Sequence, residues 1–150
     1  MSIVADDALE SIDAALQEWR QGDVVRAPDL FFVHIADLGQ PLTEAAKEAA
    51  LDIEVSDEDG LALAEIPTSA PGLVVITQTC DIVRRCNERP FIELAPLVSG
   101  VLEDELRQIR SGRRPRYAVV PALALEGLVA DLDRTMTVEK AVLARWPRTV

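Results

Sequence analysis

Residues 72–98 read GLVVITQTCDIVRRCNERPFIELAPLV. Two apolar runs rich in β-branched residues, 73–78 and 91–98, flank a polar connection that carries several arginines. Such runs predict two strands of a sheet, the first of them central and buried on both faces. Four polar residues end the first run: Gln78, Thr79, Cys80 and Asp81. Strand ends commonly display functional side chains, because the sheet holds them rigidly beside solvent. The stretch therefore predicts a β-rich core and a candidate site.

The rest of the chain is predicted to form short elements around this core. Apolar and turn residues predict further strands over 22–26, 30–35, 116–121 and 128–132. Periodicity and end signals predict helices over 5–20, 103–111 and 137–146. Segment 40–70 is acidic, and we predict a surface insertion with a hairpin at Asp59-Gly60. Short strands with helices at the side predict one mainly β domain over residues 1–150, a small curled sheet or barrel with peripheral helices.

The charge of the chain is unevenly distributed. The net charge is −11, which argues against broad, non-specific binding of nucleic acid. The window from Arg84 to Arg116 holds eight arginines and five acids, so it carries +3 and the remainder −14. These arginines are either scattered over a solvated surface or form an anion-binding face. The second interpretation predicts an acidic protein partner, an RNA, or the acidic insertion of a second copy in a homodimer. Its binding residues are Arg84, Arg85, Arg113, Arg114 and Arg116.

The compartment is predicted from what the sequence lacks. No apolar run reaches the roughly 18 residues that a spanning helix needs. Residues 1–9 carry two aspartates and no basic residue, unlike the start of a secretory signal. We therefore expect a cytoplasmic protein without a membrane partner, whose two cysteines are reduced thiols.

Cys80 is the leading candidate for a catalytic nucleophile. A nearby guanidinium from Arg84 or Arg85 favours a thiolate nucleophile, whereas the adjacent carboxylate of Asp81 disfavours it. A cysteine nucleophile also usually needs a histidine, and His34 is the only one. The alternative is that Cys80 is a small buried apolar residue.

Other polar groups offer binding rather than catalysis. Gln78, Thr79 and Asp81, together with an arginine, are suited to hold a phosphate or a peptide, or they cap the turn after the strand. The spacing C-x5-C of Cys80 and Cys86 is not a usual zinc spacing, so we predict no metal and no cofactor.

A pair of carboxylates lies at the end of the last predicted strand. Asp131 and Asp133 are two residues apart, so in a strand they point to the same face, and paired carboxylates can bind a divalent ion. No third acid is placed in sequence to complete such a site, and we interpret the pair as the solvated face of an edge strand.

Four segments together resemble the PemK/MazF-like toxin family: Gly22-Asp-Val-Val25, Gly72-Leu-Val-Val-Ile-Thr-Gln78, Phe91-Ile-Glu-Leu-Ala-Pro-Leu97 and Leu128-Val-Ala-Asp-Leu-Asp-Arg-Thr-Met-Thr-Val-Glu-Lys-Ala-Val-Leu143. Within the last, Thr137 to Leu143 is similar to the Thr-Val-(Asp/Glu)-Lys-x-x-Leu start of the family's final helix. The resemblance implies an SH3-like open barrel. It also implies either an endoribonuclease or a relative that has lost that activity.

The chain departs from the family at the catalytic positions. Pro71-Gly72 stands where the family has its catalytic Arg-Pro, and Thr77 and Thr79 stand where its catalytic hydroxyl lies. We therefore expect a non-catalytic or degenerate barrel that acts as a binding or regulatory component, in a toxin–antitoxin or phage-defence system. The first alternative is an endoribonuclease that uses Thr77 or Thr79 with an arginine. The second is an enzyme that depends on Cys80.

Overall fold

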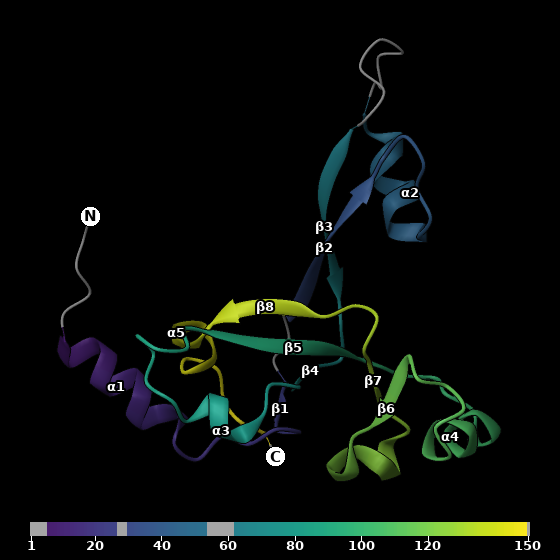
Figure 1. The fold of residues 1–150 in the computed structure, drawn as a ribbon. Coiled ribbons are helices and arrows are strands. Elements are labelled where there is room, and N and C mark those ends of the chain that lie inside the picture. Colours follow the sequence, from purple (N-terminus) through teal and green to yellow (C-terminus); the bar gives the residue numbers. More distant parts are fainter. Residues whose placement is uncertain (1–5, 27–29, 54–61, 150) are drawn as a thin grey trace. The chain divides into compact units, whose positions relative to one another are not determined.

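The structure is a computed structural model that describes residues 6–26, 30–53 and 62–149 (Figure 1). The chain divides into two compact units. Unit 1 comprises Met1–Leu30 and Ala70–Val150, and unit 2 comprises Phe31–Ser69.

Unit 1 is built on a six-stranded antiparallel sheet. Its strands are β1 (Val24–Val25), β4 (Leu73–Val75), β5 (Phe91–Val98), β7 (Val129–Asp131), β6 (Tyr117–Val119) and β8 (Met136–Glu139). The first five lie side by side in that order, and β8 pairs with β5. The two apolar runs of the 72–98 stretch therefore form adjacent strands, and β4 is buried along its whole length as predicted.

Strand β5 changes partner along one edge, and Pro96 lies at the change. Phe91–Leu94 pair with β8, whereas Leu97 and Val98 pair with β7. The Leu97 N–H donates to the Gly72 carbonyl at 2.9 Å, on the β4 side. Backbone groups alternate along a strand, so the nitrogen of Pro96 faces the opposite edge, between β8 and β7. A proline is tolerated in this central strand because its missing N–H falls where no partner strand needs it.

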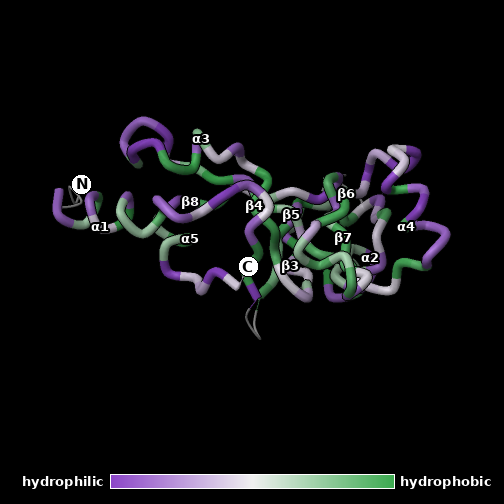
Figure 2. Tube along the Cα trace, turned by 90° about the horizontal axis from the view of Figure 1, so that it is seen from below, coloured by the Kyte–Doolittle hydropathy of each residue, from purple (hydrophilic) through white to green (hydrophobic). Residues whose placement is uncertain are grey.

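The core of unit 1 lies where β1, β4 and β5 approach closely. Gly72 permits this approach, because a Cβ there would meet the Val25 carbonyl oxygen at 2.9 Å and the Leu97 Cδ1 at 3.0 Å. One buried cluster comprises Val24, Val74, Ala95, Leu97, Val120, Leu123, Leu128 and Ala130. Apolar residues follow β5 and β7 in Figure 2, and hydrophilic residues gather in the connections around α3 and α4.

The helices of unit 1 border the sheet. They are α1 (Asp6–Leu16), α3 (Thr79–Ile82), α4 (Glu103–Arg110), the 3-10 helix η1 (Pro121–Glu126) and α5 (Lys140–Leu143). Among the described residues, no helix is both long enough and apolar enough to cross a bilayer. The helix predicted over 137–146 is wrong in its first turn, because Thr137 and Val138 pair with β5 as part of β8.

Unit 2 is a hairpin with one helix. Strand β2 (Phe31–Asp37) pairs antiparallel with β3 (Leu63–Ser69), and α2 (Glu44–Leu51) lies between them in sequence. Thr43 begins α2, since its hydroxyl accepts the N–H of Ala46 at 3.2 Å. Unit 2 contains most of the predicted acidic insertion and starts earlier, at Phe31. The hairpin predicted at Asp59-Gly60 lies outside the described residues.

The fold is mixed α/β with antiparallel sheets, and of the described residues 29% are in strands and 31% in helices. The expectation of a mainly β protein is therefore not confirmed, because helices between the strands contribute as many residues as the strands do. In the described part of the chain the strands form no closed barrel, and the SH3-like barrel is not confirmed. The single domain over 1–150 stays a prediction.

Candidate functional site

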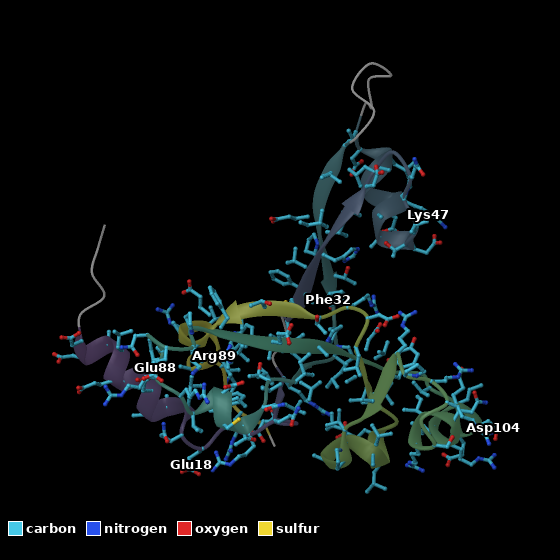
Figure 3. All side chains as sticks on the ribbon, in the orientation of Figure 1. Glu18, Phe32, Lys47, Glu88, Arg89 and Asp104 are labelled. Carbon is cyan, nitrogen blue, oxygen red and sulfur yellow. The ribbon has the colours of Figure 1, made fainter. Side chains whose placement is uncertain are left out.

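A cleft of about 500 Å³ opens where β4 ends, and we call it the strand-end cleft. Two isoleucines are among its lining residues, the half-buried Ile76 and the fully buried Ile92. Seven residues supply its polar groups and its exposed aromatic ring: Gln21, Thr77, Gln78, Asp81, Arg89, Phe91 and Glu93. Figure 3 labels Arg89, which lies on the connection between α3 and β5. The structure thus brings together Thr77, Gln78 and Asp81, which the sequence nominated, with Arg89 of the connection and with Phe91 and Glu93 from the start of the second run.

The two predicted hydroxyl nucleophiles hold the backbone around this cleft. Thr77 Oγ1 accepts the N–H of Glu93 at 2.7 Å, and Thr79 Oγ1 accepts the N–H of Gln21 at 3.1 Å. The side chain of Gln21 donates in turn to the carbonyl of Ile76 at 2.8 Å. These bonds continue the pairing of β4 beyond Val75 by side-chain groups, so both threonines serve the local structure.

Asp81 attracts two arginines at the mouth of the cleft. The Nε atoms of Arg84 and Arg89 lie 3.6 Å and 3.8 Å from its Oδ1. Both arginine side chains are more than half exposed, so each pair stabilises the fold by less than about 1 kcal/mol. The cleft therefore presents a guanidinium and two carboxylates that solvent reaches, with an amide from Gln78.

Cys80 is exposed and has no histidine near it in sequence or in its unit. Its thiol donates to Gln78 Oε1 at 3.7 Å. The single histidine of the chain, His34, belongs to unit 2, where its ring stacks on Phe32. Both cysteines are free thiols. The arrangement around Cys80 in unit 1 therefore supplies no general base of the kind that activates a cysteine.

Cys86 is buried and belongs to a different environment from Cys80. Burial, followed by a hydrogen bond to the Asp13 carboxylate, raises the pKa of the Cys86 thiol to about 11. The Cys86 main-chain N–H also donates to Asp13 Oδ1 at 2.8 Å. No three His, Cys, Asp or Glu side chains gather as a possible metal site anywhere in residues 6–26, 30–53 and 62–149.

Lys140 anchors the segment that carries the charged residues of the cleft, and we call residues 79–90 the anchored segment. Its Nζ donates to the carbonyls of Asp81, at 3.0 Å, and Arg84. Its main-chain N–H donates to the carbonyl of Pro90 at 2.8 Å. Lys140 is 1% exposed, and desolvation lowers its pKa. Sequence reasoning missed this role; the available signal was a lysine directly after a strand in Thr137-Val-Glu-Lys140.

The five arginines predicted to form one face do not gather. Arg84 and Arg85 follow α3, whereas Arg113, Arg114 and Arg116 follow α4, and the two helices lie apart in both Figure 1 and Figure 2. Arg114 pairs with Glu105 at 2.9 Å. Arg116 pairs with Asp131 and Asp133, which lie outside the window in sequence, so formal charge along the chain overstates the positive surface at this residue.

Asp131 does not lie on the solvated face of an edge strand, and that prediction is wrong for this residue. It is 0% exposed and lies on β7, between β5 and β6. It accepts hydrogen bonds from Arg116, at 2.9 Å, and Arg134, at 2.7 Å. Burial opposes ionisation, but these two guanidinium groups outweigh it and lower the pKa of Asp131. Asp133 is the exposed member of the pair and lies 3.7 Å from Arg116.

Comparison of the chain with known protein families, with curated proteins and with solved structures finds no match.

Proposed function

We propose that this chain is a non-catalytic binding or regulatory component, a degenerate relative of the PemK/MazF-like toxins, and that the strand-end cleft is its recognition site. The cleft is the observation that supports this proposal, because donors and acceptors that solvent reaches converge there beside the exposed ring of Phe91. We further propose that it works in the cytoplasm, in a toxin–antitoxin or phage-defence system.

The bonding of the two threonines supports a binding role over RNA cleavage. An endoribonuclease needs a cation beside its reacting hydroxyl, because charge develops on the phosphate in the transition state. The hydroxyl oxygens of Thr77 and Thr79 accept main-chain N–H groups. Arg84 and Arg89 are directed to Asp81 rather than to either threonine.

Binding is tested by selecting peptides from a random display library on the immobilised protein. We expect enriched peptides whose affinity falls at least about tenfold in Gln78→Ala, the effect of losing one hydrogen bond between the Gln78 amide and a charged group of the ligand. The matched control is Gln40→Ala, at an exposed glutamine of unit 2, which should bind as the wild type does. If no enriched peptide distinguishes these two variants, the cleft is not a recognition site.

Catalysis is tested on the purified protein and in cells. We expect no cleavage of cellular RNA and no growth arrest on expression. RNA cleavage that is lost in Thr79→Ala would establish the endoribonuclease instead. We also expect Cys80 to react with iodoacetamide no faster than free cysteine at neutral pH. A faster reaction would favour the Cys80-dependent enzyme.

A further inference from the structure

The outer face of β5 and β8 presents an aromatic ring between two carboxylates. Cross-strand register places Phe91 opposite Glu139 and Glu93 opposite Thr137. Residues two apart share a face of a sheet, so these four side chains are neighbours, and we call them the β5–β8 face. Phe91 is 57% exposed, and the other three residues are exposed as well. Because Phe91 and Glu93 also line the strand-end cleft, the face continues the cleft.

The two carboxylates of this face are not neutralised by the described residues. The ion pairs of the described part of the chain include neither Glu93 nor Glu139. Glu139 precedes α5, yet its side chain makes no capping hydrogen bond there. Two unpaired carboxylates beside an exposed ring attract a cation, since the ring face adds a cation–π interaction of about 0.5–1 kcal/mol.

The free edge of β8 adds a means of docking. Within the described residues β8 pairs with β5 alone. The Lys140 N–H faces β5, where it meets the Pro90 carbonyl. By alternation, Val138 and Met136 also direct their backbone groups to β5, and Thr137 directs its N–H and carbonyl outward. An open edge of this kind accepts an extended peptide as an additional strand.

We propose that the β5–β8 face binds an extended basic segment of a partner protein, which adds to the edge of β8. Lys or Arg at alternate positions of this segment then lies beside Thr137 and Glu139, and its long side chain reaches across β8 toward Phe91 and Glu93. The proposal rests on the proposed function, because it names the ligand class of the strand-end cleft. Charge complementarity selects this occupant, since unpaired carboxylates repel an acidic peptide or an RNA backbone. The basic residues are expected at every second position of the segment, because every second side chain of an added strand faces the same side of the sheet.

The experiment measures binding of a fluorescent synthetic peptide with lysine at every second position by anisotropy. Two control peptides have the same composition with the lysines contiguous, or glutamate in place of lysine. We expect the alternating peptide to bind tightest and the glutamate peptide not to bind. Glu93→Gln/Glu139→Gln should weaken binding about tenfold, the effect of losing two exposed charge pairs.

Matched controls separate this surface from net charge. Glu18→Gln/Glu103→Gln removes the same charge from exposed residues of unit 1 and should leave the affinity unchanged. Equal weakening by both double variants, or equal binding of the two lysine peptides, overturns the proposal. If display selection yields peptides that depend on Gln78 and are not basic, the proposed function stands and this ligand class is wrong.

Discussion

The ammonium group of Lys140 donates a hydrogen bond to the main-chain carbonyl of Asp81 at 3.0 Å. The same lysine also holds the carbonyls of Arg84 and Pro90, so one residue fastens both ends of the anchored segment. Asp13 of α1 holds its middle through the Cys86 N–H. The exposed charges of the cleft thus stand on a segment whose backbone is fixed from beneath by buried groups.

Lys140→Met should destabilise unit 1. The methionine fills the space of the buried lysine but leaves the partly buried carbonyls of Asp81 and Arg84 without their donor, which costs about 2 kcal/mol of unfolding free energy. Urea denaturation followed by circular dichroism measures the loss. Lys47→Met, at an exposed lysine of α2 paired only with Glu44, is the control and should change the free energy by less than about 0.5 kcal/mol. Equal stability of Lys140→Met and wild type would contradict the anchoring role.

Cys86 should make stability fall in alkali. Its pKa is about 11 in the folded chain against an ordinary 9.0, so between these values the folded state retains a proton that the unfolded state has lost. The folded state binds more protons there, and stability decreases as pH rises, by at most about 3 kcal/mol for this group, which is two pKa units at about 1.4 kcal/mol each. Compared with wild type, Cys86→Ala should therefore show a shallower decline from pH 9.0 to about 11 in urea titrations. Cys80→Ala, at the exposed thiol, should follow the wild type, and identical slopes in all three proteins would refute the assignment.

Asp131→Asn should cost about 3 kcal/mol of unfolding free energy, because it leaves Arg116 and Arg134 facing a buried neutral amide. Thermal unfolding of the variant measures this. Asp133→Asn is the matched control; that side chain is 64% exposed, so its loss should be under about 1 kcal/mol. The folded pKa of Asp131 is below its ordinary 3.8, so its contribution is present above that pH and disappears as pH falls through the folded value. A variant as stable as Asp133→Asn would show that the pairs around Asp131 are dispensable.

Gly72→Ala should destabilise the junction of β1, β4 and β5. The added Cβ lies 2.9 Å from a main-chain oxygen of Val25, so the strands must separate, at a cost of about 1–3 kcal/mol. Chemical denaturation measures the loss of unfolding free energy. Pro71→Ala, at the exposed neighbouring residue, should lose less unfolding free energy than Gly72→Ala. A Gly72→Ala protein with unchanged midpoint would mean that β1 shifts freely.

Several elements could be predicted because their signals are local. Strand β5 has the predicted bounds, since its apolar run is bordered by Pro90 and the Ser99-Gly100 turn. Helix α4 is predicted to within a residue, because acids open it and Gly112, with φ of 71°, ends it. The candidate site at the end of the first apolar run is also predicted from a local signal, the change from apolar to polar residues. Thr77, Gln78 and Asp81 line the cleft.

The remaining features depend on partners distant in sequence. The local sequence around Thr137 suits either a helix or a strand, and its pairing opposite Glu93 of β5 makes it part of a strand. In the sequence Asp131 resembles a solvated carboxylate, and only the folded chain brings the guanidinium groups of Arg116 and Arg134 to it. Lys140 likewise resembles a surface lysine, and only folding brings carbonyls of the anchored segment to its ammonium group. Hydrophobic periodicity reports which residues are buried in one element. The charge and hydrogen-bonding capacity of a buried polar group are satisfied only by chain folded against it, so the tertiary structure alone assigns these partners.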